Sequence, residues 1–228
     1  MTLTIVPVFR HLSWLAPTFG LAAFLILGSL AHGEDYPLPV TTSPSYHRVH
    51  AVAGNDVLNI RQDPSAQSEI VGHFGPHASP VEIIDTKNGW GRVIAGEGNG
   101  WVRLKYLRIV NLPRLGQSRI PSIMSCSGTE PLWGLEFSAK GTAAFSSQGS
   151  GETATFTVSH AIPLSGRSTM DAVWMRNPNA VATAFVSREF CSDGMSDRLY
   201  GHRVIFSISA SDRAQGYEGC CLVKSPAR

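Results

Sequence analysis

The sequence predicts a mainly β protein, in which a small β-barrel is followed by an antiparallel β-sandwich or barrel. Two observations lead to this fold class. Short apolar runs alternate with glycine-containing turn signals from residue 46 to residue 110, which is typical of a small barrel. Alternating bulky residues return beyond residue 123, and this period of two is typical of strands with one buried face. A length of 228 residues suits two small domains.

Residues 1–33 have the features of a signal peptide. Arg10 is the only formally charged residue in this segment, residues 19–30 are almost wholly apolar, and residues 29–31 have the small-x-small pattern of a cleavage site. The segment predicts export to the periplasm. The alternative is an uncleaved N-terminal anchor, because the uncharged stretch at residues 12–31 approaches the length that spans a membrane.

Residues 34–45 are rich in proline, serine and threonine and predict a tether, and residues 111–123 predict a linker because prolines and a glycine interrupt any period. Between them, residues 46–110 predict five or six short strands. We expect turns at Gly54-Asn55, Asn88-Gly89 and Asn99-Gly100, where a positive φ is easily accommodated. The apolar runs lie at residues 49–52, 57–60, 70–74, 81–84, 91–94 and 100–102.

The ordered residues of this segment resemble the bacterial SH3 family. The residues that carry the resemblance are Val57-Leu58-Asn59-Ile60-Arg61, Pro64-Ser65, Ile70-Val71-Gly72, Val81-Glu82-Ile83, Asn88-Gly89-Trp90, Val93, Gly100-Trp101-Val102 and Tyr106-Leu107. The chain departs from the family pattern at Asp63 and Gly91. The resemblance implies an SH3-like barrel that binds peptide or glycan of peptidoglycan.

Aromatic and basic side chains are the candidate ligand-binding residues of this segment. An indole offers a large apolar face and one N–H donor to a peptide or sugar, and the alternative is that both indoles belong to the barrel core. The candidates are Trp90, Trp101, Arg103, Lys105 and Tyr106.

Charge is unevenly distributed along the chain. A formal net charge of +2 excludes the strongly basic footprint of a typical nucleic-acid-binding domain. Arg103, Lys105, Arg108, Arg114 and Arg119 nevertheless follow one another with no acidic residue among them. They predict a basic edge, which is either a solvated strand end and linker or a surface that contacts an anionic partner.

Four cysteines lie in the predicted second domain, residues 124–224, at Cys126, Cys191, Cys220 and Cys221. An even number of cysteines in an exported chain predicts two disulfides, with three possible connectivities. Side chains of adjacent residues on a strand point to opposite faces. Cys220 and Cys221 should therefore each pair with a distant partner. Metal binding is the competing hypothesis, but the chain has no CxxC pair.

The second domain also has period-two sets and short motifs. Its motifs resemble a domain of exported proteobacterial proteins that has no established activity; they are Cys126-Ser127-Gly128-Thr129-Glu130-Pro131, residues 192–198 with Tyr200, and Gly219-Cys220-Cys221. Asp193 and Asp197 are turn residues or, alternatively, metal or acid–base groups. The alternating sets are Trp133, Leu135 and Phe137; Ala154, Phe156 and Val158; Val181, Thr183 and Phe185; and Val204, Phe206 and Ile208.

An enzyme hypothesis rests on Cys126-Ser127-Gly128, which resembles the nucleophile segment of NlpC/P60 cell-wall cysteine peptidases. In that family the cysteine opens a helix, whereas Pro131 and the alternation from Trp133 to Phe137 predict a strand. We therefore expect a non-catalytic envelope protein without cofactor or metal that binds peptidoglycan. A structural or inhibitor-like factor that binds an envelope protein is the first alternative, and a hydrolase is the second.

Overall fold

The computed structural model of the chain describes residues 43–224. The predicted signal peptide and most of the predicted tether lie outside the described residues. The described residues belong to one compact unit. Within residues 43–224 the regular elements are β-strands and one short 3-10 helix, which confirms the mainly β class. The described part of the chain contains no helix long and apolar enough to cross a membrane.

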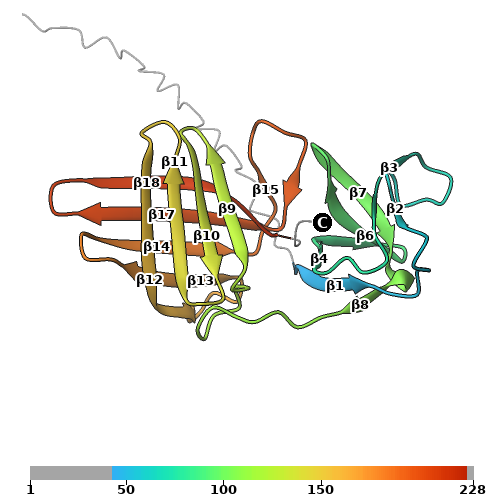
Figure 1. Cartoon of the computed structure of the whole chain (residues 1–228), viewed down its shortest axis with the longest axis horizontal. Coiled ribbons are helices and arrows are strands. Elements are labelled where there is room, and N and C mark those ends of the chain that lie inside the picture. Colours follow the sequence, from blue (N-terminus) through green and yellow to red (C-terminus); the bar gives the residue numbers. More distant parts are fainter. Residues whose placement is uncertain (1–42, 225–228) are drawn as a thin grey trace, which may run out of the picture. The chain divides into compact units, whose positions relative to one another are not determined.

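The first group of strands forms an SH3-like module of two small sheets (Figure 1). One sheet has the order β4-β1-β8, and the other has the order β3-β2-β7-β6-β5. The elements are β1 (Ser45–Val49), β2 (Leu58–Arg61), β3 (Ile70–Phe74), β4 (Val81–Ile83), β5 (Asp85–Lys87), β6 (Trp90–Ala95), β7 (Gly98–Arg103), the 3-10 helix η1 (Leu104–Tyr106) and β8 (Leu107–Ile109). Their core consists of Val49, Leu58, Ile60, Val81, Ile83, Val93, Val102 and Leu107.

Two of the three turns expected in this module are present. The third expected turn, Asn99-Gly100, is part of a strand. Asn88 and Gly89 have φ values of 50° and 78° and join β5 to β6, and residues 54 and 55 form a turn. Asn99-Gly100 instead lies inside β7, and the hairpin turns at Gly96, where φ is 56°. Gly100 serves close packing, because a Cβ there would lie 2.4 Å from Cγ2 of Ile60.

The first strand of the module also differs from the expectation of a strand at residues 49–52. Strand β1 ends at Val49, and Ala51 has a φ of 55°, a left-handed conformation that a strand does not allow. The apolar residues at positions 49–52 therefore mark the exit of β1 and the loop that follows it.

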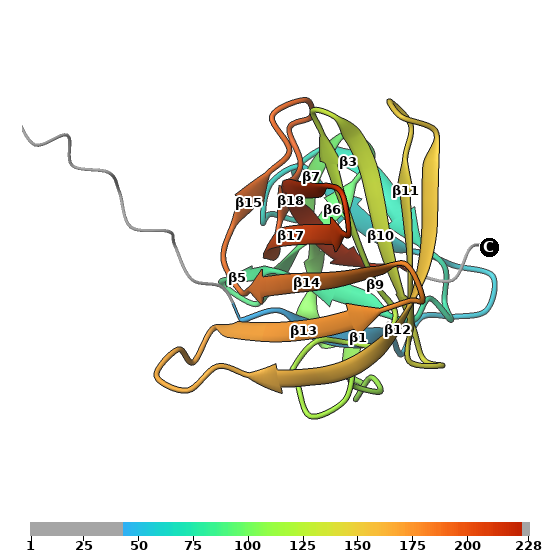
Figure 2. The same cartoon turned by 90° about the vertical axis from the view of Figure 1, so that its left-hand side faces the viewer.

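The second group of strands forms a closed antiparallel barrel with the order β10-β11-β12-β13-β14-β17-β18-β9, so of the two predicted alternatives the structure has the barrel. Figure 2 shows β12, β13, β14 and β17 side by side in one wall. The strands are β9 (Met124–Thr129), β10 (Leu132–Ser138), β11 (Thr142–Ser147), β12 (Glu152–Pro163), β13 (Met170–Arg176), β14 (Ala180–Ser187), β17 (His202–Ala210) and β18 (Ala214–Val223). A separate hairpin of β15 (Cys191–Ser192) and β16 (Leu199–Tyr200) lies between β14 and β17 in sequence.

Bulky side chains fill the barrel interior. Trp133, Leu135 and Phe137 are all buried, as their alternation indicates. Trp133, Phe145, Phe206 and Tyr217 form a cluster with ring centroids 5.2–5.9 Å apart, a distance typical of favourable aromatic pairs. An eight-stranded barrel is just wide enough for its side chains to fill.

Strand β14 reverses its apparent pattern. Val181 and Phe185 are exposed, whereas the small residues Ala182 and Ala184 point inward and are buried. Phe206 on the neighbouring strand is paired with Ala184 in register and fully buried. Small side chains on β14 leave interior volume for such bulky neighbours. The larger members of an alternating set therefore do not always mark the inner face.

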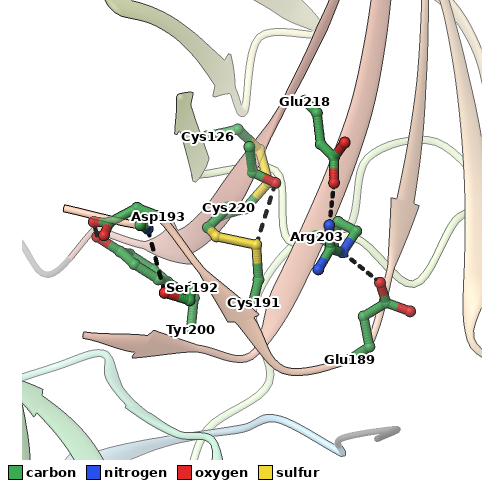
Figure 3. The surroundings of a disulfide bond; sticks show 12 residues. Cys126, Glu189, Cys191, Ser192, Asp193, Tyr200, Arg203, Glu218 and Cys220 are labelled. Atoms are coloured by element: carbon green, nitrogen blue, oxygen red, sulfur yellow. Dashed lines mark hydrogen bonds and ion pairs between the residues drawn. A yellow bond between two sulfur atoms is a disulfide. The ribbon is translucent and has the colours of Figure 1, made fainter. Parts of the chain in front are cut away.

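Two disulfides join the four cysteines, and the chain has no free thiol among the described residues. Cys126 pairs with Cys221, and Cys191 pairs with Cys220 (Figure 3). The adjacent cysteines thus reach distant partners, as predicted. Cys221 contributes to the barrel core, whereas Cys220 belongs to a separate small cluster with Cys191 and Tyr200. One disulfide closes the barrel wall, and the other fastens the β15–β16 hairpin to β18.

Candidate ligand-binding groove

A cavity of about 610 Å³ opens on the SH3-like module. Four of the five candidate residues line it: Trp90, Arg103, Lys105 and Tyr106. Trp101 is the exception. The other wall comes from the loop after β1, from strand β2 and from the segment between β2 and β3. Its residues are Ala51, Val52, Ala53, Asp56, Val57, Leu58, Asn59, Arg61 and Ala66.

The wall around Trp90 is formed by the β6–β7 hairpin. Trp90 is the first residue of β6, directly after the Asn88-Gly89 turn, and is paired in register with Arg103. The Arg103 guanidinium lies 4.9 Å from the centre of the Trp90 ring system, within the range of a cation–π interaction. Trp90 is only 5% exposed. It therefore supports the groove mainly as a core residue and holds Arg103 in place.

Trp101 lies on the opposite strand, β7, two residue pairs further along the hairpin. It pairs in register with Arg92, whose guanidinium lies 4.8 Å from the centre of the indole ring. Asp85 on the neighbouring strand lies 3.8 Å from Arg92. Trp101 is 7% exposed. Each of the two indoles is thus covered by an arginine, and neither indole is exposed on the surface of the sheet.

Positive charge dominates the groove. Arg61, Arg103 and Lys105 line it against a single carboxylate, Asp56. The Nζ atom of Lys105 lies 4.7 Å from the ring centre of Tyr106, and Arg61 donates a hydrogen bond to the carbonyl of Ser68 at 2.6 Å. These contacts hold Lys105 beside an aromatic ring and Arg61 beside a backbone carbonyl. The groove can accept a carboxylate-bearing ligand with an apolar portion.

Sequence reasoning did not include the loop at residues 51–57 or strand β2 in the candidate site. Asn59 and Arg61 have a recognisable signal, because they flank buried Ile60 and must point away from the core. The loop has no such signal. Its approach to η1 depends on a hydrogen bond from the His50 amide to the Tyr106 carbonyl, at 2.8 Å.

The segment at residues 192–198 is a structural turn in the second domain. The Asp193 carboxylate accepts hydrogen bonds from the backbone amides of Met195 and Ser196, at 3.0 and 2.9 Å, and from the Tyr200 hydroxyl at 3.0 Å. Partial burial raises the pKa of Asp193, but these hydrogen bonds outweigh burial and lower its pKa to about 2. Figure 3 shows Asp193 directed at Tyr200 beside the Cys191–Cys220 disulfide. This arrangement explains Asp193 as a turn residue.

The same hairpin contacts the turn of the β6–β7 hairpin. Asn99 donates to the carbonyl of Leu199 at 3.0 Å and accepts from the Leu199 amide at 2.6 Å. Arg198 donates to the carbonyl of Gly96 at 2.7 Å and pairs with Glu97 at 2.8 Å. The ion-pair partner of Arg198 is therefore Glu97.

Replacing Asn99 by alanine should weaken this contact markedly. The change removes both hydrogen bonds with Leu199 and leaves a partly buried amide and carbonyl without a partner, which costs about 1–3 kcal/mol. Hydrogen exchange at the Leu199 amide should accelerate. Glu97→Ala is the comparator, because its carboxylate is 83% exposed and exposed ion pairs contribute little. Unchanged Leu199 exchange in Asn99→Ala would contradict the assigned role.

Comparison with known proteins gives one family. Residues 56–108 match the family described as "Bacterial SH3 domain", so this segment is similar to bacterial SH3 domains, as the ordered residues predicted. No curated protein and no solved structure matches the chain. The match does not extend to the second domain, whose resemblance to an exported proteobacterial family has no support and stays a prediction.

Proposed function

We propose that this chain is a non-catalytic protein of the bacterial envelope, and that the groove of its SH3-like module binds a carboxylate-bearing peptide of peptidoglycan. The observation that carries the proposal is the charge of the groove. Arg61, Arg103 and Lys105 line it beside one carboxylate, in a segment similar to bacterial SH3 domains. Peptides and sugars of the wall carry carboxylates that such a groove would attract.

The disulfides support an exported location. Disulfides form and persist in oxidising compartments such as the periplasm, and here they join all four cysteines of the chain. The same bonds bear on the hydrolase alternative. Cys126 lies in strand β9 and is bonded to Cys221, which leaves no thiol at the proposed nucleophile position. A role without catalysis is the simplest account of this segment.

Binding in this groove should be modest. Arg103 and Lys105 are exposed, and exposed ion pairs contribute only about 0–1 kcal/mol each. Association must also offset the loss of translational and side-chain freedom. We expect micromolar or weaker affinity that decreases as salt is added, because salt screens exposed charges.

The purified chain should co-sediment with insoluble peptidoglycan at low salt. Arg103→Ala combined with Lys105→Ala should reduce the retained fraction several-fold, and the difference from the unmodified chain should shrink at high salt because screening already weakens the charge contribution. Lys105→Ala alone should have a smaller effect of the same sign. This single variant leaves the Arg103–Trp90 contact intact.

The matched control is Arg48→Ala with Arg108→Ala. These two arginines are exposed, lie opposite each other on β1 and β8, and do not line the groove. Their removal takes away the same charge and should leave co-sedimentation nearly unchanged. A folded chain that stays in the supernatant at low salt would refute wall binding and would favour an envelope protein as the partner.

A further inference from the structure

A second cavity of about 610 Å³ lies apart from the groove and is rich in arginine. It is lined by the start of β1, by the chain that follows β8 and by residues beyond β14. Arg114, Arg119 and Arg188 all line it, and no carboxylate does. The apolar lining includes Ile109, which is 75% exposed, and Leu112.

Arg119 is held rigidly at this cavity. Its Nε atom donates to Asp171 at 3.1 Å, and its backbone amide donates to the same carboxylate at 2.9 Å. Its guanidinium also donates to the carbonyls of Met170, at 2.8 Å, and of Ser168. The Asp171 side chain is 2% exposed. This carboxylate is therefore fully engaged by Arg119 and closed to a ligand.

Arg188 lies close to Arg119, because its guanidinium donates to the same Ser168 carbonyl. Among the described residues no carboxylate lies within ion-pair distance of Arg188, and its Nε atom is buried without a hydrogen-bond partner. Burial and the neighbouring Arg119 both lower the pKa of Arg188, although Asp171 partly opposes them. Two guanidiniums thus share one compensating carboxylate.

The other charged residues around the cavity do not neutralise its excess positive charge. Arg114 is exposed and forms no ion pair within the described part of the chain. Glu82 lies behind the lining residue His202, with its Oε1 atom 3.4 Å from Nδ1 of the imidazole. Glu82 also accepts a hydrogen bond from the Val223 amide at 2.9 Å and its side chain is 8% exposed. The accessible charge of the cavity is therefore positive.

We propose that this cavity binds a carboxylate or phosphate group between Arg114 and Arg188, with an apolar part of the same ligand against Ile109 and Leu112. Guanidinium groups match both oxyanions because their planar fork can donate two parallel hydrogen bonds. Arg119 supplies additional positive potential from a fixed position. The site shares no lining residue with the groove of the SH3-like module, so the proposal does not rest on wall binding.

The test is a titration of the full chain with sodium phosphate, and separately with sodium acetate, at constant ionic strength. The readout is the NMR signal of the arginine Nε–H groups. The Arg188 signal should shift saturably, with a half-point in the millimolar range, while the Arg48 signal should not. A lower half-point with phosphate than with acetate identifies a phosphate-bearing ligand. A lower half-point with acetate identifies a carboxylate-bearing one.

Arg114→Ala should raise the half-point of the Arg188 shift by about threefold, as expected for the loss of one exposed charge contact. This variant removes an exposed side chain that makes no ion pair with any described residue, so we expect the chain to fold normally. Arg108→Ala removes an exposed arginine outside the cavity and should leave the half-point unchanged. A non-saturating shift with both anions, or an equal half-point in Arg114→Ala, overturns the proposal.

Discussion

Replacing Cys126 and Cys221 together by alanine should lower the free energy of unfolding of the barrel by about 4 kcal/mol. The disulfide joins residues separated by 95 positions, and a long closed loop restricts the unfolded chain more than a short one. Both cysteines are also at most 1% exposed, so the shorter alanine side chains leave unfilled volume in the core. Urea unfolding followed by tryptophan fluorescence measures the loss.

Cys191→Ala with Cys220→Ala is the comparison for this prediction. Its disulfide spans 29 positions and fastens the β15–β16 hairpin to the outside of β18. We expect a smaller loss of barrel stability, accompanied by faster hydrogen exchange at Leu199, because the hairpin loses its covalent support. Equal unfolding midpoints for the Cys126/Cys221 variant and the unmodified chain would contradict the role assigned to the first disulfide.

The strand pattern of the SH3-like module could be predicted because turns and apolar runs are local signals. Asn88-Gly89 forms the expected hairpin turn, since both residues tolerate a positive φ. Asn99-Gly100 has the same composition but lies within β7. Gly100 is needed there for close approach to Ile60. A glycine required by packing and a glycine required by a turn look alike in a single sequence.

The candidate groove could be predicted only in part. The chemistry of Trp90, Arg103, Lys105 and Tyr106 was apparent, and the structure brings these four residues to one cavity. The absence of Trp101 from that cavity depends on register, because Arg92 lies opposite Trp101 and covers it. Strand register and the path of the loop after β1 depend on tertiary packing. Neither can be read from a list of residue types.

The second arginine-rich cavity shows the same limit. The sequence shows a run of basic residues that ends at Arg119, but Arg188 lies far from this run in sequence. The fold brings the two arginines together, because both donate to the Ser168 carbonyl. Strand alternation predicted that Cys220 and Cys221 need different partners. It could not choose between Cys126 and Cys191, because that choice depends on β18 lying beside β9.

Gly219→Ala should destabilise the barrel by about 3 kcal/mol, the upper part of the usual range for overpacking. Gly219 lies in β18, the strand that pairs with β9 and carries Cys221 of the first disulfide. A Cβ at this position would lie 2.1 Å from the carbonyl oxygen of Ser127 and 2.9 Å from Cζ2 of Trp133. The oxygen belongs to the backbone of β9. Relief of the clash therefore requires the β9–β18 pairing to open, which side-chain rotation alone cannot achieve.

Gly216→Ala is the matched control for Gly219→Ala. It lies in the same strand, and a Cβ there meets no atom within 4 Å. Neither glycine has a positive φ, so both substitutions reduce the freedom of the unfolded chain in the same way. Gly216→Ala should leave stability unchanged or slightly increase it, whereas Gly219→Ala should unfold at clearly lower urea. Similar midpoints for the two variants would show that Trp133 and β9 can yield, and that close packing is not why glycine precedes Cys220.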